Sequence, residues 1–325
     1  EPIDRMDGDS LPVSAFKDCA DGQFELGASA YEKRGVAVMV PHWDESKCIQ
    51  CNQCAYVCPH ATIRPFAMTE DEAAAAPEAT RMLDAMGPKA KGMKFTMAIS
   101  PLDCMGCTNC VKVCPKGALE MVPTEQEMDQ QPVWDYCVEN VSEKKELIAA
   151  NVKGSQFKQP YLEFSGSCAG CAETAYARLV TQVAGDRMFI SNATGCSSIW
   201  GNPAATAPFC KDKDGHGPAW NNSLFEDNAE HGLGMALGYE AVQNKLVASV
   251  EEMMASDKAS DSFKAAAQAW LDSRNDVEGS KKAAAELIPE LEKAAAEGCP
   301  VAPQVLADKA YLTKKSFWIF GGDGW

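Results

Sequence analysis

The sequence predicts an α+β domain followed by an α/β domain, which suits 325 residues at about 150 residues per domain. Two cysteine blocks that share one spacing, at 48–58 and 104–114, indicate the first domain. From about residue 157 the sequence changes to glycine, small residues and short apolar runs such as 188–190. An apolar run at 317–320 leads directly into glycines, as in α/β folds that bring the backbone close to a phosphate.

Composition and charge exclude several classes of protein. Hydrophobic residues make up 46% and charged residues 23%, close to globular averages, which excludes a disordered or fibrous chain. No stretch approaches 18 uninterrupted apolar residues, so we expect no membrane span. The net charge of −16 is opposite in sign to that of a typical nucleic-acid binder. We therefore expect a globular protein that binds neither nucleic acid nor membrane.

The 15 cysteines are too many, in a chain this long, for the disulfide scaffold of a short secreted domain. Close-set cysteines in an intracellular protein are more often metal ligands or redox centres. The chain has no signal peptide at its start, so we expect a cytoplasmic protein. It begins at Glu1 and ends within a strand–turn pattern, which we interpret as a piece of a longer polypeptide.

The first elements are expected around the cysteine blocks. Residues 1–40 are interpreted as a linker and the tail of an upstream domain, with a short strand at 36–40 that Pro41 stops. The cysteine domain follows at 41–125, and 126–156 is interpreted as a linker. Between the blocks, a capping-box sequence at 69–72 precedes an alanine-rich run, which predicts a surface helix of about four turns.

The last domain is expected at 157–325. Its stretch 245–297 is rich in Ala, Lys and Glu, with helical periodicity that breaks near Asn275 and Gly279. Pro289 lies within the second predicted helix and is a candidate kink. We interpret this stretch as a solvated helical hairpin, and residues 317–320 as a strand.

The two cysteine blocks predict two 4Fe-4S clusters. Both fit C-x2-C-x2-C-x3-C-P, in which three cysteines on one loop bind one cube and the fourth binds the other cube. The first cluster is assigned to Cys48, Cys51, Cys54 and Cys114. The second is assigned to Cys58, Cys104, Cys107 and Cys110. Structural zinc and disulfides are the alternatives, but zinc sites usually pair two CxxC units over a longer spacer.

A third cysteine group is looser and comprises Cys168, Cys171 and Cys196. Three ligands are one short of a cubane cluster, and a redox CxxC or a zinc pair would be equally credible from the residues alone. The remaining cysteines are interpreted as ordinary free thiols in the interior. They are Cys19, Cys137, Cys210 and Cys299.

Several motifs together resemble the pyruvate:ferredoxin (flavodoxin) oxidoreductase family. Four motifs resemble the ferredoxin-like two-cluster domain of this family: YEKRG at 31–35, PHW at 41–43, CIQCNQC at 48–54 and CPHA at 58–61. Its thiamin-diphosphate-binding domain is resembled by residues 163–171 and 192–200, GPAW at 217–220, FEDN at 225–228 and GGDGW at 321–325. The resemblance covers most of the chain, and residues 245–297 are its least distinctive part.

This resemblance implies an α+β ferredoxin-like domain and the N-terminal part of an α/β thiamin-diphosphate-binding domain, incomplete in this chain. It implies oxidative decarboxylation of pyruvate with coenzyme A to acetyl-CoA and CO2. Electrons would pass singly through three 4Fe-4S clusters to ferredoxin or flavodoxin. Thiamin diphosphate and Mg²⁺ are the implied cofactors, and coenzyme A is the co-substrate. The remaining domains of the same enzyme are implied as partners, and we expect a homodimer.

The resemblance also implies roles for individual residues. Cys168, Cys171 and Cys196 would hold the third cluster, with a fourth cysteine expected outside this chain. Glu173 and Cys196 would lie beside the thiamin diphosphate, although Glu173 alone would read as an exposed residue at a helix start. The terminal motif would also bind this cofactor, with Asp323 as a magnesium ligand. It consists of Gly322, Asp323, Gly324 and Trp325.

The remaining magnesium ligands and the main acid–base glutamate are expected outside this chain, so no catalytic residue is assigned. Two alternatives stay open: a ferredoxin-type electron-carrier module without catalysis, and an oxidoreductase for a different 2-oxoacid. A carrier would need neither the third cysteine group nor the Gly-Asp-Gly terminus, and these features therefore favour the enzyme.

The stretch 81–118 carries a local positive charge in a negative chain. This stretch contains six basic residues and only two acidic ones, Asp84 and Asp103. The basic residues are Arg81, Lys89, Lys91, Lys94, Lys112 and Lys116. Our hypothesis is that they steer an acidic acceptor toward the cluster built on Cys104, Cys107 and Cys110. The alternative is that they only offset the negative charge of the clusters.

Overall fold

A computed structural model describes residues 2, 5–20, 22, 25–201, 206–224 and 227–321. The chain divides into two compact units, which are described separately. The first contains Glu1–Asp186 and Thr194–Pro218, and the second contains Arg187–Ala193 and Ala219–Gly321. Within the described ranges, no helix combines the length and apolar character needed to cross a membrane.

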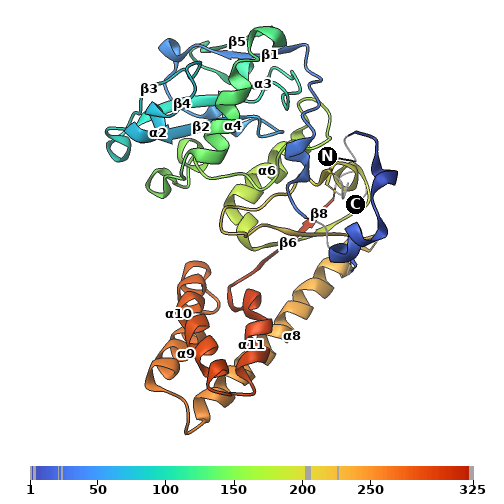
Figure 1. Cartoon of the computed structure of the whole chain (residues 1–325), viewed down its shortest axis with the longest axis vertical. Coiled ribbons are helices and arrows are strands. Elements are labelled where there is room, and N and C mark those ends of the chain that lie inside the picture. The colour runs from blue at the N-terminus through green and yellow to red at the C-terminus, as the bar shows by residue number, and fades with distance from the viewer. Residues whose placement is uncertain are drawn as a thin grey trace. The chain divides into compact units, whose positions relative to one another are not determined.

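Two antiparallel strand pairs organise the cysteine-rich part of the first unit (Figure 1). Strand β1 (Met39–Trp43) pairs with β5 (Leu119–Pro123), and β2 (Ile63–Met68) pairs with β4 (Lys94–Ile99). The short β3 (Leu83–Asp84) flanks β4. Since one cysteine block connects β1 to β2 and the other connects β4 to β5, this pairing brings the two blocks together.

The two blocks also repeat their local structure. Each contains one short helix, α1 (Gln53–Tyr56) or α3 (Asn109–Val113), and the two helices pack against each other. A left-handed residue precedes each helix, Asn52 with φ 58° and Thr108 with φ 67°. This reversal comes between the second and third cysteines of each block. The same backbone reversal therefore shapes both cysteine loops.

The stretch expected as a linker at 126–156 is folded. Helix α4 (Gln130–Asn140) packs on β4 (Figure 1). Its Trp134 lies edge-to-face with Phe164, with 6.0 Å between ring centroids. Shorter elements surround it in this unit. They are η1 (Gly8–Ser10), η2 (Val13–Cys19), η3 (Ala28–Tyr31), η4 (Glu45–Lys47), η5 (Pro88–Ala90), η6 (Thr124–Gln126), η7 (Lys145–Leu147) and α5 (Val152–Ser155).

Two elements predicted for this unit differ in length from the prediction. The strand does not stop at Pro41: β1 continues to Trp43, because a two-stranded sheet leaves an edge where the missing N–H of proline is tolerated. The helix after the capping box, α2 (Glu70–Ala74), has five residues instead of about four turns. Thr69 and Glu72 form the capping box, but Pro77 follows too closely for the helix to continue.

The first unit ends with helices that carry the third cysteine group. Helix α6 (Ala172–Ala184) begins directly after Cys171 and leads into η8 (Gly185–Arg187). Helix α7 (Cys196–Gly201) begins at the third cysteine of the group. The buried face of α6 contains Ala177 and the polar residues Thr174, Arg178, Thr181 and Gln182.

The second unit contains a parallel sheet, as an α/β domain requires. Strand β6 (Met188–Asn192) lies between β7 (Ala219–Asn222) and β8 (Ser316–Phe320). The strand predicted at 317–320 is thereby confirmed. Helix α8 (Asn228–Ala255) packs against β6 and β8.

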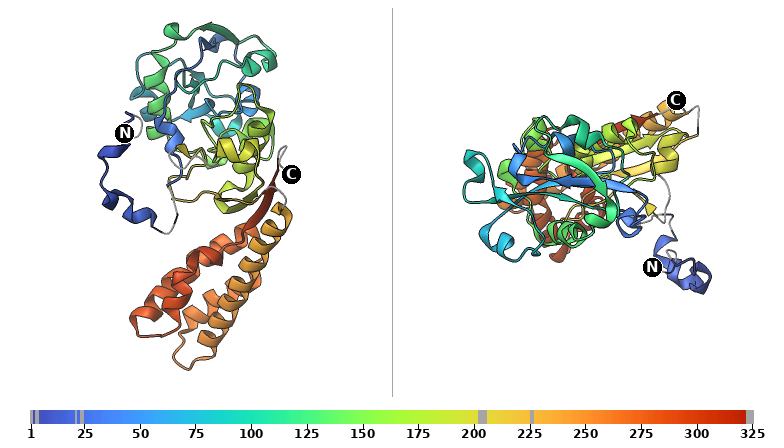
Figure 2. Two further views of the ribbon diagram at one scale, coloured as in Figure 1. Left: turned by 90° about the vertical axis from the view of Figure 1, so that its right-hand side faces the viewer. Right: turned by 90° about the horizontal axis from the view of Figure 1, so that it is seen from above.

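The insertion between α8 and β8 is a helical bundle with its own core. It comprises α9 (Asp261–Ser273), α10 (Val277–Ala296), α11 (Ala302–Ala307) and η10 (Lys309–Leu312) (Figures 1 and 2). The break near Asn275 is confirmed, whereas α10 contains both Gly279 and Pro289. Trp270 and Leu287 are fully buried in the bundle core. The expected solvated hairpin is therefore part of a packed bundle.

Candidate metal centre

One cavity of the first unit is lined by the four cysteines predicted for the second cluster. Cys58 reaches it from the first block, and Cys104, Cys107 and Cys110 reach it from the second. The exchange of one cysteine between the blocks is possible because β1 pairs with β5 and β2 pairs with β4. Cys58, Cys104 and Cys110 are buried in this arrangement.

The other four predicted ligands also gather on one side of the blocks. The thiols of Cys48, Cys51 and Cys114 are close enough to Cys54 to raise its pKa electrostatically, although burial is the larger cause. All four of these cysteines are half-buried, so this second group lies nearer to solvent than the first. The structure thus gathers the thiols of both blocks in one region of the first unit, and the assignment of each cysteine to a cluster stays a prediction.

Backbone N–H groups point at the sulfur atoms at equivalent places of the repeat. Gln50 N–H donates to Cys48 Sγ, and Gly106 N–H donates to Cys104 Sγ, each at 3.4 Å. Ala118 N–H donates to Cys114 Sγ at 3.2 Å. Hydrogen bonds of this kind stabilise negative charge on sulfur and are one of the levers that set a cluster's reduction potential.

The thiols need a cationic partner to ionise. Burial raises the pKa of Cys104 to about 12 and raises the pKa of Cys54 and Cys110 well above the usual thiol range. Such thiols stay protonated near neutral pH, because the thiolate is poorly solvated in the interior. Metal binding displaces these protons and supplies the missing positive charge. The donor set therefore suits a metal cluster and does not suit redox-active free thiols.

The spacing of the sulfur atoms distinguishes a cluster from a single ion. Four thiolates on one zinc lie about 3.8 Å apart, because each Zn–S bond is about 2.3 Å long. Among the described residues, no three cysteines bring their Sγ atoms within 4.8 Å of one another. As the side chains lie in the described residues, the cysteines therefore form no ready-made site for one tetrahedral ion.

The surroundings of Arg178 are a second indication that an anionic metal cluster suits this site. It lies on α6, is 1% exposed, and donates to Tyr56 C=O at 2.5 Å and to the amide oxygens of Gln182 and Gln156 at 2.8 and 3.2 Å. These partners within the described part of the chain are all neutral, and burial lowers the pKa of the guanidinium. A buried cation without a carboxylate needs an anion nearby. Tyr56, whose carbonyl accepts from Arg178, lies two residues before Cys58, which belongs to the group that would hold an anionic cluster.

The third cysteine group is linked to the second block through its loop. Gly170 lies against Cys107 and has φ +77°. A Cβ atom on Gly170 would lie 3.4 Å from the Cβ of Cys107 and 3.5 Å from Asn109 Nδ2. His60 Nε2 lies 3.2 Å from the carbonyl oxygen of Cys168. The loop from Cys168 to Cys171 therefore packs directly on the second block.

The residues of the expected thiamin site are only partly described. Cys171 is the residue that precedes α6, Glu173 is half-buried in the first turn of α6, and Cys196 is exposed at the start of α7. A thiol or carboxylate is favoured at a helix start because the N-terminal end of a helix carries partial positive charge. The remaining predicted residues, Gly322, Asp323, Gly324 and Trp325, lie outside the described residues.

Sequence reasoning missed several residues that shape this centre, namely His60, Gly170 and Arg178. His60 was noted only as part of CPHA, and its buried imidazole has a lowered pKa because burial disfavours the charged ring. Nothing local marks Arg178, because it lies on a helix more than a hundred residues after its partner Tyr56. Its only sequence signal is an arginine on the buried face of an amphipathic helix.

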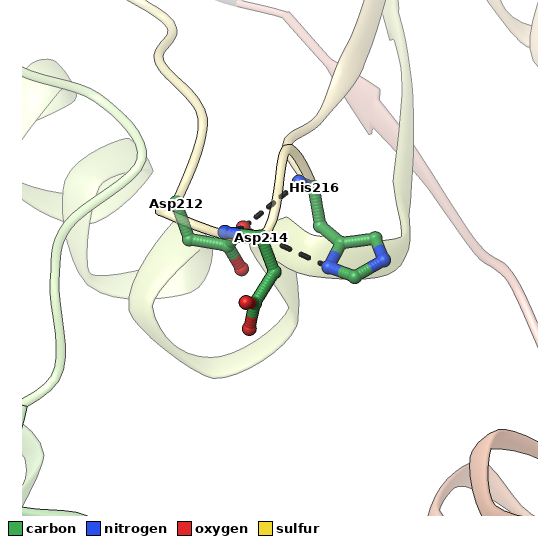
Figure 3. A group of neighbouring side chains, drawn as sticks. All are labelled: Asp212, Asp214 and His216. Carbon is green, nitrogen blue, oxygen red and sulfur yellow. Dashed lines mark hydrogen bonds and ion pairs between the residues drawn. The ribbon is translucent and has the colours of Figure 1, made fainter. Parts of the chain in front are cut away.

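Asp212, Asp214 and His216 form a further group of potential ligands that sequence reasoning missed (Figure 3). Asp212 Oδ1 accepts the N–H groups of Asp214 and His216 at 3.0 and 2.8 Å, and Asp212 Oδ2 accepts the Tyr161 hydroxyl at 2.8 Å. These bonds use the carboxylate to close a surface turn. We therefore assign this group a structural role.

Comparisons with known proteins agree with this geometry. A family model described as a 4Fe-4S dicluster domain matches residues 47–118, and one described as a domain of unknown function matches residues 1–37. The first match contains all eight cysteines of the two blocks. The chain therefore carries a 4Fe-4S dicluster domain, followed by an α/β region.

The similarity to complete proteins extends over the whole chain. This chain is 48% identical over 330 residues to the pyruvate-flavodoxin oxidoreductase of Klebsiella pneumoniae. It is 48% identical over 331 residues to the pyruvate:ferredoxin oxidoreductase of Moorella thermoacetica. It is 40% identical over 364 residues to a pyruvate dehydrogenase (NADP+) of Cryptosporidium parvum. These alignments cover 100% of this chain but 28%, 28% and 18% of the relatives. The resemblance inferred from the motifs is confirmed, and the chain matches a segment of these enzymes.

Proposed function

We propose that this chain is the electron-transfer segment, and the beginning of the thiamin-diphosphate-binding domain, of a pyruvate:ferredoxin or pyruvate-flavodoxin oxidoreductase. The whole enzyme would convert pyruvate and coenzyme A to acetyl-CoA and CO2. The observation that carries the proposal is the packing of the Cys168–Cys171 loop on Cys107 at Gly170. A third cysteine group joined to a dicluster domain in this way suits electrons that enter the domain from a catalytic site.

The proposed ligands follow the two groups of four thiols. Cys48, Cys51, Cys54 and Cys114 would hold one cluster, and Cys58, Cys104, Cys107 and Cys110 the other. Cys168, Cys171 and Cys196 would hold a third cluster with a further cysteine from elsewhere in the enzyme. Such clusters exchange single electrons. The role of the chain is to bury the sulfur atoms, donate N–H groups to them and exclude water.

The burial of the thiols supports a proposed direction of electron flow. The Cys58 group contains buried thiols and touches the third cysteine group, whereas the Cys48 group is half-buried throughout. The side chain of Ile49 in that block is 42% exposed. Electrons would therefore pass from the third group to the Cys58 group, then to the Cys48 group and out to ferredoxin or flavodoxin.

The catalytic part of the proposal rests on similarity to the relatives. Thiamin diphosphate, held with Mg²⁺, supplies the electron sink for decarboxylation. Glu173 and Cys196 would lie beside it, and Asp323 with its neighbouring glycines and Trp325 would bind the diphosphate and the metal. The other domains of the enzyme would supply the acid–base glutamate and the sites of pyruvate and coenzyme A. We also propose a homodimer in the cytoplasm.

The test is Cys196→Ser in the full enzyme. Wild type should show three 4Fe-4S signals by electron paramagnetic resonance, and the variant should lose one of them together with pyruvate-dependent reduction of the other two. Cys299→Ser is the matched control, because Cys299 is a half-buried thiol in the helical bundle and should leave all three signals. Three unchanged signals in Cys196→Ser, with full reduction by pyruvate, would show that Cys196 does not hold a third cluster. Clusters of the wild-type enzyme that pyruvate does not reduce would favour the electron-carrier alternative.

A further inference from the structure

The Cys48 block is fixed to a lysine-bearing segment that the spacing of the motifs does not reveal. The Gln50 side chain is buried between Cys48 and Cys51, and its Nε2 donates to Asp84 C=O at 2.8 Å. Its Oε1 accepts the Met86 N–H at 2.7 Å. Residues 84–86 are therefore held against the first block, although the local charge of 81–118 suggested a place beside the second.

A second lysine-bearing segment is attached on the same side. Asn52 Nδ2 donates to Lys153 C=O at 2.9 Å, and Lys153 Nζ donates to Met86 C=O at 3.1 Å. Helix η5 lies against η7, so residues 88–90 and 145–147 are neighbours. We call the exposed or half-buried lysines of these two segments the lysine rim. They are Lys89, Lys91, Lys145 and Lys153.

The charge of the lysine rim is largely uncompensated. Lys94 is neutralised by Asp84 at 2.6 Å, and Arg81 is neutralised by Glu127 at 2.7 Å. Within the described ranges, no carboxylate oxygen lies within 4.0 Å of a rim ammonium group, and Glu146 is the acidic residue that remains between Lys145 and Lys153. A positive surface in a chain of net charge −16 attracts a negatively charged partner.

Exposed apolar side chains lie next to the rim. Ile49 is 42% exposed and follows Cys48, and Met86 is 50% exposed and is bonded to Gln50 through its N–H. A small apolar centre with a charged surround is the composition of a transient protein–protein interface. A small inorganic anion would not need the apolar centre.

We propose that an acidic one-electron carrier protein docks on this surface, above the Cys48, Cys51, Cys54 and Cys114 site. This deepens the proposed function and rests on it. One electron leaves the reduced cluster and reduces the oxidised cofactor of the carrier, with no other reactant. The charge count along the sequence predicted docking at the Cys104, Cys107 and Cys110 group instead. Cys107 is the least buried thiol of that group, and the Gly170 loop packs against it.

The test replaces Lys89, Lys91 and Lys145 by glutamate in the full enzyme. The clusters are reduced chemically with dithionite, excess reductant is removed, and the protein is mixed with an oxidised acidic ferredoxin. The rate of ferredoxin reduction at low ionic strength should fall at least about tenfold, and this difference should shrink as salt is added. Reduction of a small neutral dye should change by less than about twofold, because an uncharged acceptor is not steered.

The matched control places the same charge change on the helical bundle, as Lys258→Glu, Lys282→Glu and Lys293→Glu. These lysines are exposed, and the control should keep the wild-type rate with ferredoxin. An unchanged rate in the rim variant, or an equal loss in the control, would overturn the docking site. Since dithionite replaces pyruvate as electron source, failure of this test is distinct from failure of pyruvate to reduce the clusters, which would overturn the proposed function.

Discussion

Arg178 illustrates how a single side chain bears on the electron path. Its guanidinium is buried on α6, holds the Tyr56 carbonyl two residues before Cys58, and is bonded to neutral oxygen atoms in the described structure. A positive charge near a cluster favours the reduced state, which is more negative than the oxidised state. We therefore expect Arg178 to act as a positioning residue and to raise the reduction potential of the cluster proposed at Cys58.

Arg178→Gln is expected to lower that reduction potential in a titration followed by electron paramagnetic resonance. It should also cost about 1–3 kcal/mol of stability, because the buried Tyr56 carbonyl loses its donor. Arg178→Lys keeps the charge and should restore most of the potential even if stability stays low. A potential that falls equally in both variants would mean that Arg178 acts only through packing.

Among the helices and strands, α2 shows how a short element is held by charge. Glu72 closes the capping box with Thr69, and its Oε2 accepts Lys144 Nζ at 2.8 Å. Burial alone would raise the pKa of Glu72, but hydrogen bonds from Lys144, Ser142 and Thr69 outweigh it and lower the pKa to about 2. The carboxylate thus joins α2 to the segment that follows α4.

The lowered pKa makes the contribution of Glu72 depend on pH. The carboxylate stabilises the fold above its ordinary pKa of 4.5, and this contribution is lost as pH falls toward about 2. Glu72→Gln should therefore cost about 1 kcal/mol near pH 7, and the difference from wild type should shrink below about pH 4.5. Urea unfolding of both proteins across this range measures it. A difference that stays constant down to pH 3 would contradict the charge-based account.

For the molecule as a whole, the two units have separate cores. The core of the cysteine domain includes Trp43, Phe95 and Leu119, and the core of the helical bundle includes Trp270 and Leu287. Each core lies within one unit of the chain. We therefore expect damage to the bundle to leave the clusters intact.

Leu287→Ala tests this separation. Leu287 is fully buried on α10, so its truncation should destabilise the bundle by about 2–5 kcal/mol. Limited proteolysis should then cut within 256–312 more readily, while the iron content and the spectra of the two dicluster sites stay at wild-type values. Loss of either cluster in this variant would mean that the units fold as one.

Much of the local chemistry follows from spacing along the chain. The repeated cysteine pattern predicts the two groups of four thiols, because three ligands of each group lie within seven residues and depend on one loop. The capping box at Thr69 and the strand at 317–320 are likewise local features, and both occur in the structure. The assignment of each cysteine to a cluster, and the thiamin site, stay predictions.

Contacts between distant segments could not be read from the sequence, because they depend on how strands pair and helices pack. Examples are Gly170 on Cys107, Arg178 on Tyr56, and Gln50 on residues 84–86. The last of these holds residues 84–86 against the first block, whereas the charge count over 81–118 predicted a basic surface at the second. Sequence spacing thus determines which residues can share a metal, and the fold determines which distant segments pack beside each cysteine group.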